Sequence, residues 1–140
     1  MSKTGYEGKC QISMTFVLKE EHRGETESIF AAHKAWIQAT HAPWGLVFYT
    51  VTINDEAENP IDPTSVRTTT GRIIANLTEV YATAEGLKKH WAEAPTQQPE
   101  LFARFLALIE ATKDGGGLFV GQSAPVFVSL LPHELQVALE

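Results

Sequence analysis

The chain has 140 residues, of which 44% are hydrophobic and 20% charged, values typical of one soluble globular domain spanning residues 1–140. Its 17 acidic and 11 basic residues give a formal net charge of −6, and no stretch concentrates Lys and Arg, which argues against binding to nucleic acid. Because Cys10 is the one cysteine, an internal disulfide and a thiolate metal cluster are excluded.

The N-terminal residues and the hydropathy pattern give no reason to expect an exported or membrane-bound protein. Residues 1–8 lack the apolar stretch of a signal peptide. No window approaches the roughly 18 consecutive apolar residues that a membrane span requires. We therefore expect a cytoplasmic protein that does not bind membranes.

The first half of the chain changes from strand-like to helix-like patterns and back. Residues 10–18 alternate with a period of two, which predicts a strand. Residues 24–41 have apolar positions at helical spacing, and Pro43 prevents this helix from continuing. Residues 44–53 are rich in aromatic and β-branched side chains and predict a second strand. The polar residues 54–70 that follow predict either a flexible loop or an elongated hairpin.

The second half begins with a strand and continues with two helices. Residues 72–81 alternate again and predict the third strand. The Thr83 hydroxyl is placed to cap the next helix, which we expect to end before Pro95. Pro99 suits the first turn of another helix with a strong apolar stripe. Residues 126–131 are apolar and β-branched, and they predict the fourth strand.

The order β-α-β-β-α-α-β predicts an α+β fold. With one helix split in two, it corresponds to a ferredoxin-like antiparallel four-stranded sheet with helices on one face. Several strands are apolar on both faces: Val47 opposes Phe48, and Val126 opposes Phe127. An apolar face without helices is commonly covered by a second copy of the chain, so we expect a homodimer.

Small polar residues alternate along the face of the sheet that the helices leave open. Gln11, Ser13 and Thr15 lie on the first predicted strand, and Asn76 and Thr78 on the third. An ordinary solvated face is one interpretation. The other is a mixed polar and apolar cavity, enclosed between sheets and helices, that binds a small-molecule ligand.

Two segments carry a resemblance to a known family. Residues 77–90 (LTEVYATAEGLKKH) resemble the antibiotic-biosynthesis-monooxygenase-like family of dimeric α+β barrels, in which a strand ending in Glu-x-Tyr or Glu-x-Trp precedes a short helix with a His. Residues 42–49 (APWGLVFY) are similar to the family's Pro-Gly turn leading into the second strand. The resemblance covers residues 10–131 and implies the same fold and dimer.

The resemblance also carries expectations about activity. The family includes cofactor-free oxygenases of polyphenolic substrates, haem-degrading enzymes and a signal-molecule isomerase. Haem-degrading members have an Asn on the first strand, a Trp ending the third strand and a His on the later helix. This chain has Gln11, Ser13 and Thr15 on the first strand, Tyr81 at the Trp position, and no His at residues 102–105. The resemblance therefore favours oxygenation or isomerisation over haem degradation.

His90 is the first candidate for chemistry. Its imidazole could act as a general acid or base, or bind a phenolic oxygen, although a structural His on a helix face is the alternative. His33, beside Trp36, has the same two interpretations. If both helices line one cavity, the imidazoles would converge with the indoles of Trp36 and Trp91, a setting that suits a planar aromatic substrate.

Tyr81 and Asn76 are further candidates. A buried Tyr could exchange a proton with a substrate oxygen, and Asn could hold a carbonyl group, although packing at the strand end explains both residues equally well. Glu79 shares a face with Tyr81. It could be a base or an ion-pair partner of Arg72 or Arg104.

Known motifs for metals and phosphates are missing. The five histidines form no closely spaced ligand pair, so we expect no metal, while a site assembled from distant residues stays open. The glycines at 115–117 follow a helix and lack a subsequent Gly-Lys-Ser/Thr, so they do not form a phosphate loop. We expect no cofactor.

Together these patterns predict a cofactor-independent monooxygenase- or isomerase-like enzyme acting on a small aromatic or carbonyl metabolite. The alternative is a non-catalytic dimeric barrel domain that binds a small ligand or another protein. The predicted catalytic residues are His90, Tyr81 and Asn76, and the predicted substrate-binding residues are Trp36, His33, Trp91, Ser13 and Thr15.

Overall fold

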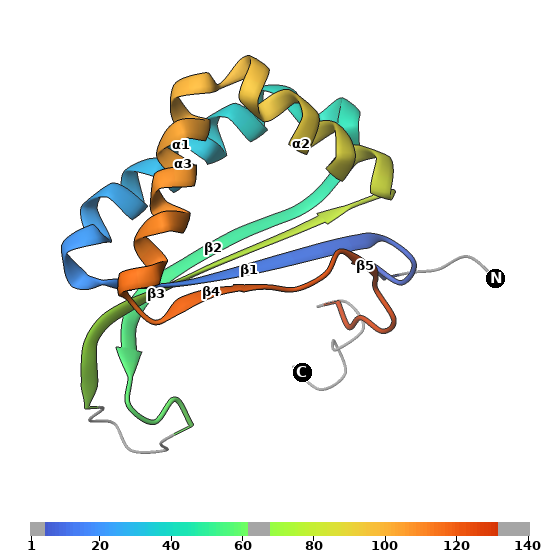
Figure 1. Ribbon diagram of the computed structural model, residues 1–140. Helices are drawn as coiled ribbons and strands as arrows, with labels where there is room; N and C mark the ends of the chain where they lie inside the picture. Colours follow the sequence, from blue (N-terminus) through green and yellow to red (C-terminus); the bar gives the residue numbers. More distant parts are fainter. Residues whose placement is uncertain (1–4, 62–67, 132–140) are drawn as a thin grey trace.

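The computed structural model describes residues 5–61 and 68–131, which form one antiparallel sheet with three α-helices over one of its faces (Figure 1). The strands are β1 (Cys10–Lys19), β2 (Leu46–Ala57), β3 (Thr69–Tyr81), β4 (Gly117–Val120) and β5 (Ala124–Pro125). The helices are α1 (Arg23–Thr40), α2 (Ala84–Gln97) and α3 (Pro99–Ala111), with short 3₁₀ turns at Glu20–His22, Ala42–Trp44 and Thr112–Asp114.

The order of the strands across the sheet is β2-β3-β1-β4, and β5 also pairs with β1. Glu79 of the central strand β3 lies opposite Ile12 of β1 on one side and opposite Tyr49 of β2 on the other. Opposed residues of neighbouring strands share a face, so these three side chains all point toward the helices.

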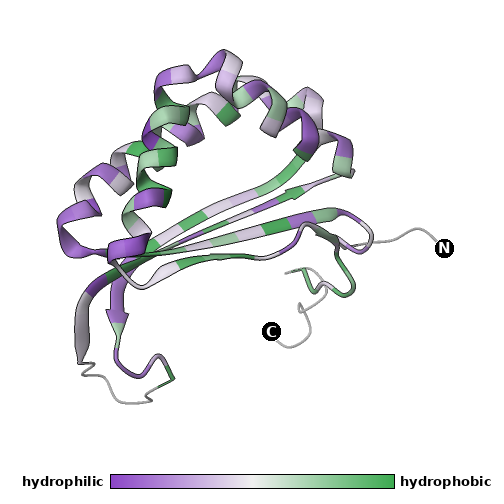
Figure 2. Ribbon diagram, viewed as in Figure 1, coloured by the Kyte–Doolittle hydropathy of each residue, from purple (hydrophilic) through white to green (hydrophobic). Residues whose placement is uncertain are grey.

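The main core lies between the sheet and helices α1 and α3. Figure 2 shows hydrophobic residues recurring along the strands and along the helices that cover them. Burying a large apolar side chain stabilises the fold by about 1.5–3 kcal/mol. The core side chains are Phe16, Leu18, Ile73, Ala75 and Leu77 from the sheet, and Ile29, Phe30, Leu101 and Leu108 from the helices.

The first and third strands and all three helices are confirmed to within a few residues, with two local differences. Helix α2 continues through Pro95 to Gln97. Because the proline lies in the last turn, the backbone hydrogen bond that it removes affects only the end of the helix. Thr83 is the N-cap of α2, but its side chain makes no capping hydrogen bond.

Of the two interpretations of residues 54–70, the described part fits an elongated hairpin. Strand β2 extends to Ala57 and β3 begins at Thr69, and the Glu58 amide donates to the Thr68 carbonyl over 2.8 Å. Both strands run beyond the rest of the sheet (Figure 1). Residues 62–67 of this connection lie outside the described residues.

The prediction of a fourth strand at residues 126–131 is wrong. The edge of the sheet is formed by residues 117–120, which pair with β1. A Cβ atom on Gly116 would lie 2.3 Å from the Val17 side chain, so glycine lets the chain join β1 directly after α3. Pro125 then already lies opposite Cys10, the first residue of β1, and residues 126–131 run past its end.

The helix-free face of the sheet is less apolar than expected. A bulge between Leu46 and Phe48 turns Leu46 toward the helices, where it packs against the Cys10, Ile12, Tyr81 and Leu87 cluster. Phe48 stays on the open face, and the other β2 residues that share this face are Thr50, Thr52 and Asn54. The exposed aromatic rings on the open face therefore lie on the two edge strands, Phe48 on β2 and Phe119 on β4.

Candidate functional site

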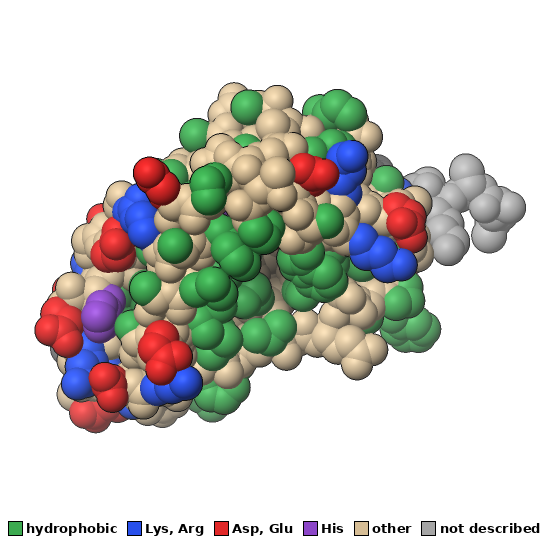
Figure 3. Space-filling view, turned by 45° about the horizontal axis from the view of Figure 1, so that its top comes forward, with side chains coloured by type: hydrophobic (Ala, Val, Ile, Leu, Met, Phe, Trp, Pro, Cys, Tyr) green, Lys and Arg blue, Asp and Glu red, His purple; other side chains and the backbone are tan. Residues whose placement is uncertain are grey.

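A cavity of about 300 Å³ lies between the helix-facing side of the sheet and the helices. Figure 3 shows a hollow bordered by hydrophobic side chains on the helical side of the molecule. Its volume is at the lower end of the range for small-molecule sites. Its walls are mainly apolar and include Ile12, Met14, Leu77, Leu101, Phe102 and Phe105.

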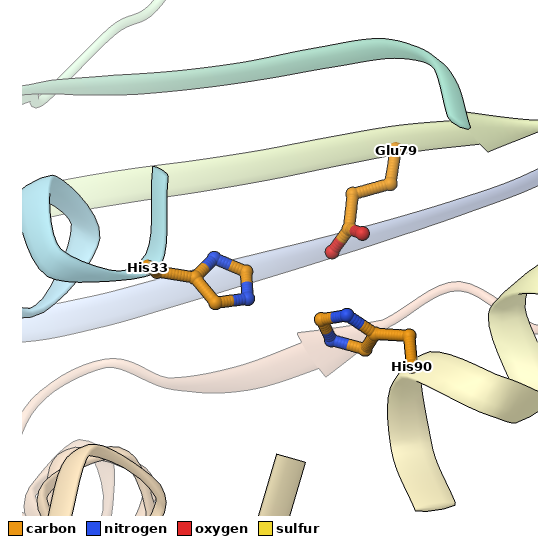
Figure 4. A group of neighbouring side chains, drawn as sticks. All are labelled: His33, Glu79 and His90. Atoms are coloured by element: carbon orange, nitrogen blue, oxygen red, sulfur yellow. The ribbon is translucent and has the colours of Figure 1, made fainter. Parts of the chain in front are cut away.

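Three polar residues on three different elements converge in this cavity. His33 comes from α1, Glu79 from β3 and His90 from α2, and one nitrogen or oxygen atom of each lies within 4.8 Å of the other two. The imidazole rings point toward each other, and the carboxylate of Glu79 is directed at the space beside them (Figure 4). Their exposed fractions are only 8%, 3% and 8%, respectively.

Local packing explains how helix α2 brings His90 over the sheet. Gly86, in the first turn of α2, lies so close to the preceding turn that a Cβ atom would be 2.1 Å from the Trp44 carbonyl oxygen. The same atom would lie 2.8 Å from the Tyr81 ring. Glycine therefore allows the close approach of α2, and His90 follows one turn later on the buried face.

A chain of contacts orients the His90 ring. Its Nδ1 lies 2.7 Å from Nε2 of His41, and Nδ1 of His41 lies 2.8 Å from Oγ1 of Thr40, which also contacts the Trp36 carbonyl. A carbonyl can only accept, so the single hydroxyl proton of Thr40 points to Trp36 when all contacts are hydrogen bonds. His41 then donates to Thr40, and His90 donates from Nδ1 to His41. The lone pair of His90 is left on Nε2.

The other two polar residues of the cavity are held in a similar way. Nδ1 of His33 lies 2.9 Å from the hydroxyl of Tyr49. The Tyr81 hydroxyl donates to Oε1 of Glu79 over 2.5 Å. Each of the three cavity residues therefore has one polar atom fixed by a neighbour and a second atom available for a ligand.

The unused atoms are accessible from the cavity. In the described part of the chain, no hydrogen bond reaches Nε2 of His33 or of His90. All fully enclosed side-chain nitrogen and oxygen atoms of the described residues have a hydrogen-bond partner. The two Nε2 atoms therefore lie open to the cavity.

Burial keeps the imidazoles neutral. It lowers the pKa of His33 to about 4, with a smaller contribution from His41, and lowers the pKa of His90 to about 3, with smaller contributions from His33 and His41. Burial raises the pKa of Glu79 to about 7, although the hydrogen bond from Tyr81 acts in the opposite direction. Neutral imidazoles can accept a proton or coordinate a metal ion.

Four of the predicted site residues are brought together around the cavity: His33, Trp36, His90 and Trp91. Trp36 packs beside His90, with ring centroids 5.2 Å apart and the rings tilted by 42°, and its Nε1 donates to Gln97 over 2.9 Å. Trp91 is 50% exposed and forms the outer margin of the cavity.

The other predicted site residues lie elsewhere. Tyr81 is buried behind Glu79 and does not line the cavity. Asn76, Ser13 and Thr15 lie on the opposite face of the sheet, since alternation separates them from the inward positions. There Asn76 donates to Thr15 over 2.8 Å, and the hydroxyls of Ser13 and Thr78 are 3.1 Å apart.

Sequence reasoning missed His41 and Tyr49 and left the role of Glu79 open. In the structure Arg72 pairs with Glu56 and Arg104 with Glu25, so neither arginine is the partner of Glu79. A charged residue at an inward position of a buried strand is the signal that could have identified Glu79. His41 closes the predicted helix at helical spacing from His33 and Ile37, but the sequence does not show that it contacts a histidine of another helix.

Comparisons with known proteins leave the family open. The chain matches no model of a known protein family, and it matches no curated protein. Among the described residues, none of the helices has the length and apolar character needed to cross a membrane.

Proposed function

We propose that the chain is an isomerase- or monooxygenase-like enzyme that acts on a small aromatic or carbonyl compound in the cavity. The observation that carries the proposal is the convergence of His33, Glu79 and His90 at one place in an otherwise apolar cavity. A planar ligand could stack on Trp36 and Trp91 with its oxygen beside these polar groups.

The same groups suit the first step that both reactions share. Isomerisation, like the cofactor-free oxygenation of a phenol, begins with the removal of a proton from an O–H group or from a C–H group next to a carbonyl. The lone pair on Nε2 of His90 faces the cavity and can accept a hydrogen bond from this group, while Glu79, whose pKa burial raises to about 7, is suited to accept the proton. An isomerase then returns the proton to another atom of the substrate, whereas an oxygenase passes the electrons to dioxygen.

The resemblance to the antibiotic-biosynthesis-monooxygenase-like family supports this proposal. The Glu-x-Tyr strand end is Glu79 and Tyr81, which are hydrogen-bonded to each other, and the histidine of the following helix is His90, which lines the cavity. The antiparallel sheet with helices on one side agrees with the fold of that family.

Within the same proposal, two copies of the chain form a dimeric α+β barrel. Residues 126–131 have a strand-like sequence but belong to no strand of the described chain. Phe127, Val128 and Leu130 are 89%, 71% and 65% exposed. They follow the edge strand β4, which carries the exposed Phe119. A second copy would bury these exposed apolar side chains.

Light scattering of the full chain tests the dimer. The native protein is expected to have twice the mass of one chain, and Phe127→Asp is expected to shift it toward the monomer. A native protein that remains monomeric at high concentration contradicts the dimer.

One observation favours the alternative of a non-catalytic binding domain. Tyr81 and Asn76, two of the three predicted catalytic residues, do not line the cavity. A ligand-binding domain needs only the apolar walls and the polar groups that position the ligand.

Ligand binding is tested with a library of small phenols and carbonyl compounds, using thermal unfolding as the readout. Ala94 lines the cavity, whereas Ala92, on the same helix, is exposed and does not. Ala94→Trp is expected to abolish the stabilisation by any hit, and the control Ala92→Trp to preserve it. Equal stabilisation of both variants contradicts a ligand site in the cavity.

Turnover of the compounds that bind separates an enzyme from a binding domain. His90→Ala is expected to retain binding of the compound and lose turnover, while the control His22→Ala, outside the cavity, keeps both. Binding without turnover in the native protein supports the alternative.

A further inference from the structure

We infer that His33, Glu79 and His90 form a binding site for a divalent transition-metal ion. The inference deepens the proposed function, and it rests on that function only for what the ion does to a substrate. The existence of the site stands on geometry. The three side chains come from α1, β3 and α2 and meet at one end of the cavity (Figure 4).

The donor set determines the kind of ion. Two imidazole nitrogens and one carboxylate oxygen suit Zn²⁺, Fe²⁺ or Co²⁺, while Mg²⁺ and Ca²⁺ prefer sites made of oxygen atoms. Such metals bind these donors at about 2.0–2.2 Å, so two donors on one ion are at most about 4.4 Å apart. One nitrogen or oxygen atom of each residue lies within 4.8 Å of the other two, so the side chains need to move closer together to bind one ion.

Neighbouring residues fix the donors as they do in known metal sites. A histidine that binds a metal through one nitrogen usually has its other nitrogen held by a hydrogen bond, which sets the tautomer and the ring orientation. Here Tyr49 holds Nδ1 of His33, and His41 holds Nδ1 of His90. Tyr81 similarly holds one oxygen of Glu79. All three ligands are oriented before an ion arrives.

The buried carboxylate gives an independent reason to expect a cation. Glu79 is 3% exposed, and no salt bridge of the described residues includes it. An ionised carboxyl group in an apolar interior is unfavourable unless a positive charge or several hydrogen bonds compensate it. Tyr81 supplies one hydrogen bond. A bound cation would supply the missing charge.

Three protein ligands leave open coordination positions, as in catalytic rather than structural metal sites. These positions face the cavity, where Trp36 and Trp91 would flank a bound compound. A phenolic or carbonyl oxygen of the substrate could bind the ion there. The ion would then act as a Lewis acid and lower the pKa of the phenolic O–H group, or of the C–H group next to the carbonyl. The imidazoles then hold the ion, and the ion takes over the activation of the substrate.

Metal titration of the full chain tests the site. Protein freed of metal by a chelator is titrated with Zn²⁺ by calorimetry and with Co²⁺ by visible absorption. One ion per chain is expected, with the visible bands of a low-symmetry Co²⁺ complex. His33→Ala, His90→Ala and Glu79→Gln are each expected to lose more affinity than the 10–100-fold that an outer hydrogen-bond partner is typically worth.

The controls keep the result interpretable. His22→Ala removes a histidine outside the cavity and is expected to bind both metals like the native protein. Circular dichroism shows whether each variant is folded, and Glu79→Gln preserves the shape of the side chain. Metal binding that is absent in the native protein, or unchanged in the folded Glu79→Gln variant, overturns the inference.

A parallel measurement separates this inference from the proposed function. The phenol and carbonyl library is screened against the chelator-treated and the Zn²⁺-loaded native protein. If compounds bind but the protein takes up no metal, the metal site is contradicted and the proposed function stands. Metal uptake without any bound compound supports the ion and counts against the proposed function.

Discussion

Nδ1 of His90 and Nε2 of His41 lie 2.7 Å apart, although the two residues are 49 positions apart in the chain. This contact joins helix α2 to the residue that follows α1. Because His41 is also hydrogen-bonded to Thr40, the direction of the His90 lone pair depends on a residue that does not line the cavity. His41 is therefore a positioning residue for the candidate site.

Replacing His41 with Phe tests this relationship. The ring contact with Trp44, with centroids 4.3 Å apart, can be kept, while both hydrogen-bonding nitrogens are lost. We expect Zn²⁺ affinity to fall about 10–100-fold, as for other hydrogen-bond partners of metal ligands. Stability is expected to fall by about 1–3 kcal/mol, since Nδ1 of His90 loses its partner. Calorimetric titration and thermal unfolding measure the two effects, and unchanged Zn²⁺ affinity contradicts a positioning role.

Glu79→Gln is expected to stabilise the metal-free protein at alkaline pH. Burial raises the pKa of Glu79 from 4.5 to about 7 in the folded chain. Because the folded pKa is the higher one, the protonated carboxyl favours the folded state, and this stability is lost as the pH rises through 4.5–7. Glutamine cannot ionise, so the variant gains up to about 3 kcal/mol near pH 8, and the gain disappears below about pH 4.5.

Unfolding midpoints of both proteins in chelator, measured across this pH range, test the prediction. A variant that is less stable than the native protein at alkaline pH contradicts it. Higher stability together with lost metal affinity would show that Glu79 is kept for function at the expense of stability.

Two glycines provide a matched test of how α2 is positioned. Gly86→Ala places a Cβ atom 2.1 Å from the Trp44 carbonyl oxygen, a backbone atom that cannot easily move. We expect a loss of about 1–3 kcal/mol and weaker Zn²⁺ binding, because His90 moves with the helix. Gly24→Ala in α1 meets no atom within 4 Å and is expected to stabilise the protein by about 0.4–1 kcal/mol. Equal stability of the two variants contradicts the close approach of α2.

The sequence predicted those parts of the site that depend on local periodicity. Helical spacing placed His33 and Trp36 on one face, and strand alternation placed Glu79 and Tyr81 together. The contact between His41 and His90 depends on how the end of α1 packs against α2. The periodic spacing of residues reports secondary structure and does not reveal tertiary contacts of this kind.

Residues 126–131 show the same limit for the fold. Their β-branched and apolar side chains favour a strand, but a strand needs a partner, and β1 begins only at Cys10. Local propensity does not reveal where the neighbouring strand ends. Asn76, Ser13 and Thr15 were predicted to share a site with His90, although strand alternation places them on the face opposite to Glu79 and Tyr81.

The location of the ligand can be tested on the two faces of the sheet. Asn76 lies on the helix-free face, away from the cavity, whereas Trp91 lines the cavity. We expect Asn76→Ala to leave the affinity for a phenolic or carbonyl ligand within a factor of about two, the usual effect of a substitution away from a site. Trp91→Ala is expected to weaken binding markedly through the loss of ring stacking. If Asn76→Ala abolishes binding and Trp91→Ala does not, the ligand lies against the helix-free face, between two copies of the chain. His33, Glu79 and His90 would then have no part in binding it.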